Sequence, residues 1–383
     1  ALASSDLAVD ALFRQTGVIR VDTMEQLFQT AAVLAHQPLP AGRRVAIVGN
    51  SGGPGVLAAD ACEAVGLDVP ELSPATQQAL RACLPPAAGV RNPVDMTAAA
   101  EPATCQQGLR ILLADAGVDA VMAVCTPTLV TSLETMAAAI AEVGAEPWDK
   151  PLVANLIGTE GIPEVMRGRR AVPSFPFPET AAQALARAAW YAEWRRRPPG
   201  TVRQLDGIDL RTPRRLVEEF LAAAPGGGWL DPVVAGRVLD GFGIPIASEQ
   251  LCAGIGVETI AGVERDPAFG PVIMFGLGGI AAELVGDRAV RVAPLTDQDA
   301  AELVRSLRSS PLLFGYRNSA PTDVAAIEDL LLRLSVLGQQ LPEIAELDLN
   351  PVIAGPDGVV ATGWRIRVTP AERHPERDLR RLR

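Results

Sequence analysis

The stretch Arg44-Val45-Ala46-Ile47-Val48-Gly49-Asn50-Ser51-Gly52-Gly53-Pro54-Gly55-Val56-Leu57-Ala58-Ala59-Asp60 decides the fold. Its apolar run, Val45 to Val48, is long enough for a buried strand. The loop Gly49 to Gly55 is rich in glycine, which lets a backbone approach a ligand closely. From Val56 onward the stretch predicts a helix. This order aims backbone N–H groups and a helix N-terminus at an anion, although a tight turn in any α/β domain has the same pattern.

The composition indicates an ordinary globular protein. The 383 residues are 48% apolar and 21% charged, and their number predicts two to three domains. The net charge of −11 leaves no basic stripe for a phosphate backbone, which argues against nucleic acid as a partner. No apolar run approaches the roughly 18 residues of a membrane span, so we expect no membrane partner. The N-terminus lacks Met and a basic segment, and we expect the chain to be a piece of a longer protein.

Cations and nucleophiles of some types are scarce. Lys150 is the only lysine, and His36 and His374 are the only histidines. A lysine clamp or a histidine relay therefore has almost no candidates. The five cysteines are scattered without a Cys-x-x-Cys pair, which predicts reduced cysteines in a cytoplasmic protein and no cysteine metal site.

Helices alternate with apolar runs through the first half of the chain. Residues 7–37 predict a helix, a short strand at 18–21 and a second helix capped by Asp22 or Thr23. Residues 44–195 predict a mostly parallel sheet. The loops 49–55, 126–128 and 155–160 follow strands of that sheet and are expected along one edge, where ligands bind in such sheets.

The second half predicts an α+β domain. Residues 196–228 are assigned to a linker, and a helix is expected to start at Asp231 or Pro232. Two strands joined at Asp266-Pro267 and a final hairpin of 345–354 and 359–368 follow. The tail 371–383 is charged.

Five ordered motifs cover nearly the whole chain and resemble one family, the NDP-forming acyl-CoA synthetases. This is the superfamily of succinyl-CoA synthetase and ADP-forming acetate–CoA ligase. The motifs are Asn50-Ser51-Gly52-Gly53-Pro54-Gly55, Asn92-Pro93-Val94-Asp95, Leu152-Val153-Ala154-Asn155-Leu156-Ile157-Gly158-Thr159-Glu160, Met274-Phe275-Gly276-Leu277-Gly278-Gly279 and Glu346-Leu347-Asp348-Leu349-Asn350-Pro351.

The resemblance implies the fold class: flavodoxin-like, succinyl-CoA synthetase-like doubly wound parallel sheets plus an incomplete ATP-grasp α+β domain. The predicted domains are the C-terminal part of a first CoA-ligase domain (1–40), a second CoA-ligase domain (44–195), a linker (196–228), an ATP-grasp-like domain (229–370) and the tail (371–383). The implied cofactors are ATP or ADP, CoA or acyl-CoA, and Mg²⁺. In the family, a histidine on a swinging loop carries a phosphoryl group, and its motif is expected just ahead of Ala1.

The resemblance also implies site residues. No catalytic residue lies in this chain, since the histidine is expected outside it. The implied anion-binding residues are Asn50, Ser51, Gly52, Gly53 and Gly55; Asp95 and Glu160 are possible ligand-orienting residues; Glu258, Gly276, Gly278 and Gly279 are nucleotide-binding; Asp348 and Asn350 are metal ligands. For Ser51 the alternatives are a nucleophile and a hydroxyl that binds a ligand oxygen, and without an adjacent base we favour the latter. For Asp95 and Glu160, helix capping is the alternative.

Two departures from the family pattern bear on function. Only four residues, including Cys252, stand between Leu251 and Gly256, where the family has a long lysine-bearing segment. Gly363 stands where the family places a metal-binding Asp, so we expect Mg²⁺ to be held weakly.

Three hypotheses follow. The first, chosen because of Gly363 and the missing histidine and lysines, is a degenerate ligase-like region. It would bind an acyl-CoA or nucleotide-like ligand and regulate an attached or partner GNAT acetyltransferase, as in the Pat-type protein lysine acetyltransferases. The alternative is an active ADP-forming acyl-CoA ligase with a phosphohistidine relay. The third is an interaction scaffold. A homo-oligomer is expected in each case.

Overall fold

A computed structural model describes residues 2–129, 131–158, 163–167, 171–247, 256–279, 286–317 and 320–371. The chain forms two compact units, one of Ile19–Arg197 and one of Ala1–Val18 with Pro198–Arg383. None of the helices in these ranges combines the length and the hydropathy that a bilayer crossing requires. Glu160, Cys252 and His374 lie outside the described residues.

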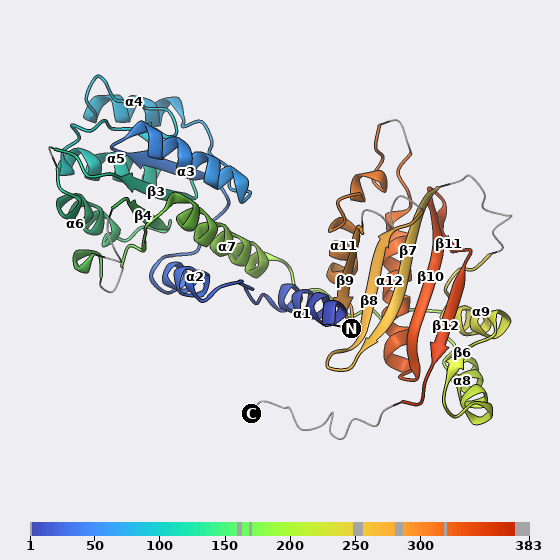
Figure 1. The fold of residues 1–383 in the computed structure, drawn as a ribbon. Helices are drawn as coiled ribbons and strands as arrows, with labels where there is room; N and C mark the ends of the chain where they lie inside the picture. Colours follow the sequence, from blue (N-terminus) through green and yellow to red (C-terminus); the bar gives the residue numbers. More distant parts are fainter. Residues whose placement is uncertain are drawn as a thin grey trace. The chain divides into compact units, whose positions relative to one another are not determined.

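The unit Ile19–Arg197 is built on a five-stranded parallel sheet (Figure 1). Its strand order is β2-β1-β3-β4-β5, and every neighbouring pair is parallel. This order is that of the flavodoxin-like doubly wound fold, which confirms the predicted class. The strands are β1 (Val45–Gly49), β2 (Val94–Asp95), β3 (Ala120–Cys125), β4 (Leu152–Leu156) and β5 (Ser174–Phe175).

Helices cover both faces of this sheet, because alternate residues of each buried strand face opposite cores. In β1, Val45 and Ile47 belong to one core cluster, while Ala46 and Val48 belong to the other. The first face carries α2 (Met24–His36), α3 (Gly52–Ala64) and α7 (Pro178–Arg196). The second carries α4 (Pro74–Cys83), α5 (Pro102–Ala114), α6 (Leu133–Gly144) and the short helix η1 (Glu164–Met166).

The other unit is built on an antiparallel sheet in the order β6-β12-β10-β7-β8-β9, with β11 paired to β10. Its strands are β6 (Gly228–Trp229), β7 (Val257–Asp266), β8 (Gly270–Leu277), β9 (Arg288–Val292), β10 (Ile344–Gly355), β11 (Gly358–Ala361) and β12 (Trp364–Val368). Its helices are α1 (Leu2–Thr16), α8 (Arg211–Ala223), α9 (Pro232–Gly241), α11 (Asp297–Arg305), α12 (Val324–Gln340) and the short η3 (Ser310–Leu312). A single core joins α8, α9, α11 and α12 to one face of the sheet.

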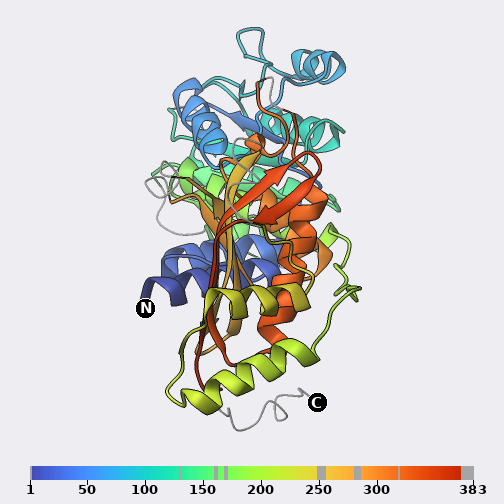
Figure 2. The same cartoon turned by 90° about the vertical axis from the view of Figure 1, so that its right-hand side faces the viewer.

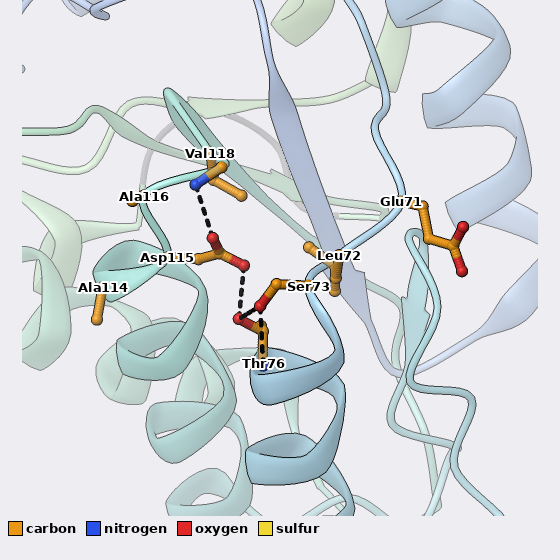
Figure 3. A pocket seen from close by; sticks show the side chains of 9 residues that line it. Glu71, Leu72, Ser73, Thr76, Ala114, Asp115, Ala116 and Val118 are labelled. Carbon is orange, nitrogen blue, oxygen red and sulfur yellow. Dashed lines mark hydrogen bonds between the residues drawn. The ribbon is translucent and has the colours of Figure 1, made fainter.

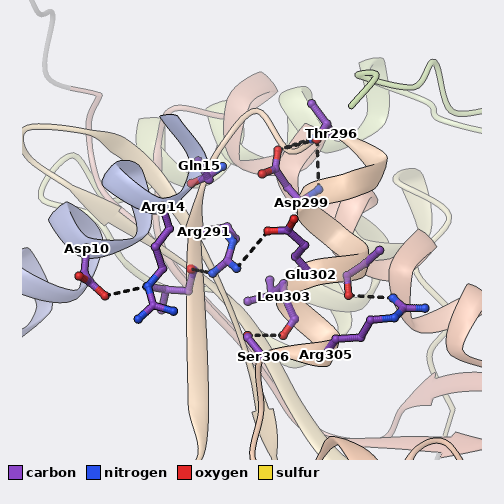
Figure 4. Close-up of polar contacts among 12 residues, drawn as sticks. Asp10, Arg14, Gln15, Arg291, Thr296, Asp299, Glu302, Leu303, Arg305 and Ser306 are labelled. Atoms are coloured by element: carbon purple, nitrogen blue, oxygen red, sulfur yellow. Dashed lines mark hydrogen bonds and ion pairs between the residues drawn. The ribbon is translucent and has the colours of Figure 1, made fainter. Parts of the chain in front are cut away.

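Figure 2 shows α12 and α1 on opposite sides of the antiparallel sheet. Helix α1 packs on the edge strand β9 through Gln15, whose side-chain amide donates to the Val292 carbonyl at 3.1 Å and accepts from its N–H at 2.8 Å. On the other side of β9, the buried Arg291 points toward Glu302 of α11 (Figure 4). The side chain of Gln15 thereby satisfies part of an otherwise unpaired strand edge.

Several predicted elements differ from the observed ones. Residues 18–21 form no strand, because α1 ends there and no neighbouring strand pairs with them. The predicted linker 196–228 contains α8, and the predicted strand 359–368 is divided into β11 and β12. Helix α3 begins at Gly52 rather than Val56, since Pro54 falls in its first turn, where no N–H partner is needed. Whether residues 1–40 complete a domain with sequence outside this chain stays a prediction.

Candidate functional site

The junction of β1 and α3 lies where the order of the parallel sheet reverses, between β2 and β3. The predicted glycine loop is shorter than expected, because Ser51 is the N-cap of α3 in extended conformation (φ −156°, ψ 130°). The first N–H groups of a helix have no partner within it, and here they belong to the exposed Gly52 and Gly53. The Ser51 side chain makes no capping bond. This junction therefore offers two backbone donors and one hydroxyl at the positive end of a helix.

The side chain of Asn50 links the ends of two neighbouring strands. Its side chain is 2% exposed, and its amide nitrogen donates to the Thr126 carbonyl at 2.8 Å. Its amide oxygen accepts from the Thr126 N–H at 2.9 Å and lies 3.3 Å from the Thr126 hydroxyl. These bonds fix the carboxyl ends of β1 and β3 to each other, and so position Ser51. The side-chain amide of Asn50 therefore has a positioning role, and the predicted anion contact of Asn50 stays a prediction.

Asp95 lies against the first turn of α3. A Cβ atom placed on Gly52 would stand 2.9 Å from Asp95 Oδ2, so only glycine fits beside this carboxylate without a shift. Asp95 Oδ1 accepts from the Thr97 N–H at 2.9 Å. Thr97 has φ of +70°, a strained conformation for a β-branched residue. Asp95 therefore lies beside the start of α3, and its expected ligand-orienting or capping role stays a prediction.

Asn92, of the Asn-Pro-Val-Asp motif, holds β1 from its other side. Its amide oxygen accepts from the Ile47 N–H at 2.9 Å, and its amide nitrogen donates to the carbonyls of Val45 (2.9 Å) and Pro70 (3.0 Å). Strand β2 pairs with β1 only at Val48 and Gly49, so Asn92 takes the place of a longer strand. Roles for Asn92, Thr97 and the Thr126 side chain were not predicted. Thr97 and Thr126 are polar residues just after strands, and Asn92 precedes the cis proline of the Asn-Pro-Val-Asp motif.

Asn155, near the end of β4, also joins two neighbouring strands through its side chain. It is fully buried, and its amide nitrogen donates to the Phe175 carbonyl at 2.8 Å. Among the described residues, its amide oxygen has no hydrogen-bond partner. Glu160, expected nearby, lies outside the described residues, so its predicted role stays a prediction.

Side chains that could act as nucleophiles are not poised for it. Burial raises the pKa of the Cys62 and Cys105 thiols to about 12, and that of Cys125 also rises on burial. His36 is exposed at the end of α2. At the opposite edge of the sheet, the hydrogen bond from Arg44 lowers the pKa of Asp119, whose side chain is 4% exposed. That ion pair joins the starts of β1 and β3 and serves the fold.

A cavity of about 490 Å³ also lies at that opposite edge, between α4 and α5 (Figure 3). Thr76 donates to Asp115 Oδ2 at 2.6 Å across it, and Asp115 Oδ1 accepts from the Gly117 N–H at 2.7 Å. It is lined by Glu71, Leu72, Ser73, Thr76, Ala114, Asp115, Ala116, Gly117 and Val118. None of the predicted site residues reaches this cavity.

The structure brings together three of the four predicted nucleotide residues. The Gly278 N–H donates to the Glu258 carbonyl at 2.8 Å, and a Cβ on Gly279 would stand 3.1 Å from Glu258 Oε2. Gly276 is further along β8, paired with Ile260. Glu258 is exposed on β7, so its carboxylate is available to a ligand.

The predicted metal ligands do not form a metal centre in the described part of the chain. Asp348 Oδ2 is 3.1 Å from both Nε and Nη2 of Arg365, and Asn350 is exposed. A Cβ on Gly363 would stand 2.1 Å from the Asn350 carbonyl oxygen, so no side chain fits there without a backbone shift. Within the described ranges, no three His, Cys, Asp or Glu residues group as metal ligands. Mg²⁺ prefers several oxygen ligands in octahedral geometry, and these residues do not fit it.

Comparisons with known proteins match both units. Residues 45–196 match the ligase-CoA domain family, and residues 249–368 match the ATP-grasp domain family. The ADP-forming acetate–CoA ligase I of Archaeoglobus fulgidus is 30% identical over 440 residues, covering 95% of this chain and 62% of the relative. The ADP-forming 4-hydroxybutyrate–CoA ligase of Nitrosopumilus maritimus is 29% identical over 426 residues, covering 92% of this chain and 61% of the relative. The chain thus spans about three fifths of the length of these relatives.

A solved structure of the dinucleotide-forming acetyl-coenzyme A synthetase 1 of Ca. Korarchaeum cryptofilum, in complex with coenzyme A and Mg-AMPPCP, is 30% identical. The match covers 41% of this chain and 99% of that chain, with a TM-score of 0.37. The names of the two ligases contain CoA and ADP, in agreement with the cofactors that the resemblance implies for the family. With its ligase-CoA and ATP-grasp domains and these ligase relatives, the chain belongs to the NDP-forming acyl-CoA synthetase superfamily.

Proposed function

We propose that the chain is the ligase-CoA and ATP-grasp part of an ADP-forming acyl-CoA ligase, and that the start of α3 receives its phosphoryl group. The observation that carries this proposal is the β1–α3 junction. The bonds between Asn50 and Thr126 fix the chain ahead of Ser51, and Gly52 and Gly53 direct their N–H groups away from the helix. Preorganised donors of this kind stabilise a phosphate without reorganisation.

The relatives support the ligase function over the regulatory one. Their names describe ADP-forming acyl-CoA ligases, and none of those reported above supports the expected link to a GNAT acetyltransferase. In this proposal, an acyl-CoA and inorganic phosphate yield CoA and an acyl phosphate. The histidine expected ahead of Ala1 then takes the phosphoryl group from the acyl phosphate, which releases the free carboxylate, and passes it to ADP to form ATP. The residues of this chain bind and orient that group at α3, while Glu258 and Gly278 lie at the nucleotide end.

A second function, ligand binding without turnover, is favoured by one observation. Asp348 is bonded to Arg365 and Gly363 leaves no room for a third ligand, so the family's metal position is altered. We therefore derive no step through Mg²⁺. The predicted homo-oligomer and the cytoplasmic location stay predictions.

The phosphate site can be tested with two variants at Gly53. A Cβ there meets no atom within 4 Å, so both Gly53→Glu and Gly53→Gln fit the fold. The carboxylate of Glu would lie at the helix N-terminus and repel an anion, whereas Gln has the same size without the charge. Ligand binding to the native state at 100 times Kd stabilises by about 2.7 kcal/mol. We expect inorganic phosphate to raise the Tm of the wild type and of Gly53→Gln, and to lose this effect in Gly53→Glu.

The comparison between the two variants also separates binding from general salt effects, because phosphate stabilises folded proteins by exclusion from their surface. Equal phosphate effects on all three proteins would place binding elsewhere and overturn the proposal for α3.

A further inference from the structure

The face of the antiparallel sheet opposite its core carries a charged cluster, which we define as Glu346, Asp348, Arg365 and Arg367. Glu346 and Asp348 alternate on β10 with Leu347 and Leu349, which lie in the core. Arg365 and Arg367 alternate on β12 with Ile366 and Val368, which also lie in the core. The four charged side chains therefore share the face that the core leaves open.

Arg365 is held in place by two kinds of contact. It stands directly opposite Asp348 in the ladder, and its Nε and Nη2 both lie 3.1 Å from Asp348 Oδ2. Its guanidinium carbon lies 5.2 Å from the centre of the Trp229 ring on β6. A planar guanidinium that pairs with a carboxylate and stacks on an aromatic ring is a well-ordered cation.

The neighbouring charges are less tightly paired. Glu346 lies 3.9 Å from Arg365 Nη2 and 3.8 Å from Arg367 Nε. Two carboxylates and two guanidinium groups thus balance within the cluster. Arg367 pairs with Glu346, which makes it a matched control for Arg365.

The backbone beside the cluster excludes a side-chain ligand at position 363. The Asn350 N–H donates to the Gly363 carbonyl at 2.9 Å, where β10 carries a register shift. The close approach of Gly363 to the Asn350 carbonyl excludes any side chain at position 363. A metal beside Asp348 would meet this carboxylate, already shared with Arg365, the Glu346 carboxylate, which lies near both arginines, and the amide of Asn350.

We propose that Arg365 is a permanent cation beside the residues that the resemblance assigns to a divalent metal, so that Asp348 and Asn350 hold no Mg²⁺ of their own. A metal ion would have to displace Arg365 from Asp348 and would meet a like charge at short range. Mg²⁺ also gives up its waters reluctantly and needs several hard oxygen ligands. A nucleotide bound here would then bring its metal only as a complex with its own phosphates.

This inference concerns the ATP-grasp unit, to which the proposed function assigns nucleotide binding, but it can be tested without enzymatic turnover. Metal binding alone tests it, so its failure can be told apart from the failure of the ligase proposal.

The experiment measures Mn²⁺ bound by the 383-residue chain with electron paramagnetic resonance, in the absence of nucleotide. The wild type and Arg367→Gln are expected to show no site tighter than the millimolar range. Arg365→Gln frees Asp348 and is expected to bind one Mn²⁺ at least tenfold more tightly. The double variant Arg365→Gln with Asp348→Asn is expected to lose that gain. Arg365→Lys keeps the charge and is expected to resemble the wild type.

The side chain of Arg365 is 61% exposed, so its replacement should leave the fold intact, which circular dichroism checks. A micromolar Mn²⁺ site in the wild type that Asp348→Asn removes would overturn the inference. The inference would also be overturned if Arg365→Gln bound Mn²⁺ as weakly as the wild type does. If the glutamine variant does not fold, the wild type with and without Asp348→Asn still decides the question.

Discussion

Asn50 is the residue on which the geometry of the candidate site depends most. Replacing it with Ala would leave the partly buried N–H and carbonyl of Thr126 without the bonds that they make to Asn50. A buried polar group that loses its partner costs about 1–3 kcal/mol. We expect Asn50→Ala to lower the free energy of unfolding in urea by that amount and to weaken phosphate binding as well.

The matched control is Ser51→Ala, because the Ser51 hydroxyl makes no capping bond. It should change the stability by less than about 0.5 kcal/mol, as surface substitutions do. Equal losses in the two variants would contradict the bracing role of Asn50.

A second residue-scale prediction concerns pH. The hydrogen bond from Arg44 holds the pKa of Asp119 below the value of about 3.9 that an Asp has in the unfolded chain. Stability from this pair is therefore present above about pH 4 and is lost as the pH falls through the lowered pKa. We expect Asp119→Asn to be less stable than the wild type at pH 7, with the difference shrinking below pH 4.

Urea midpoints at pH 7 and pH 3 measure this difference. Glu63→Gln, on the exposed face of α3, is the control and should not change the pH dependence. A gap between wild type and Asp119→Asn that stays constant down to pH 3 would contradict the assignment.

At the residue scale, the sequence indicated the positions of some residues but not the contacts of their side chains. The motifs indicated that Asn50 and Asp95 lie at the carboxyl ends of neighbouring parallel strands, where the structure places them. They could not show that the Asn50 amide is engaged by Thr126, because residues 50 and 126 are 76 positions apart. The same holds for the contact of Arg365 with Asp348, which depends on the register of β12 against β10.

At the scale of elements, two adjacent glycines in the first turn of α3 differ in the space that they leave for a side chain. A methyl group on Gly52 would stand 2.9 Å from Asp95 Oδ2, while one on Gly53 meets nothing within 4 Å. We expect Gly52→Ala to destabilise the protein by about 1–3 kcal/mol through crowding. Gly53→Ala should be neutral or stabilise by up to about 1 kcal/mol, because alanine loses less entropy on folding.

Urea unfolding of the two variants measures the contrast. Adding Asp95→Ser to Gly52→Ala should restore most of the loss, since it removes the crowded carboxylate. A loss in Gly53→Ala as large as that in Gly52→Ala would contradict the geometry of the first turn.

Elements were predictable where the hydrophobic pattern was strong. Strand β3 and helices α5, α6 and α12 follow from long apolar or periodic runs. Helix α8 was assigned to a linker, because its arginine-rich start concealed the apolar spacing of Pro213, Leu216, Val217 and Phe220. Gly363 interrupts the predicted last strand, where β10 carries an irregular register that no local pattern reveals.

At the scale of the whole molecule, the two units have separate hydrophobic cores. The unit Ile19–Arg197 is one continuous segment with helices on both faces of its sheet. We expect the fragment 19–197 to fold by itself, with a cooperative urea transition and phosphate stabilisation equal to that of the full chain. A fragment without a cooperative transition would show that this unit depends on the other.

The central claim is that the start of α3 receives a phosphoryl group during ATP formation. The most direct measurement is ATP formed from acetyl-CoA, ADP and phosphate by the product of the complete gene, in wild type, Gly53→Gln and Gly53→Glu. The account predicts ATP formation by the wild type, a partial decrease with Gln, and a loss of at least 100-fold with Glu, a loss typical of a removed electrostatic stabiliser. Wild-type turnover that Gly53→Glu leaves unchanged would contradict the claim.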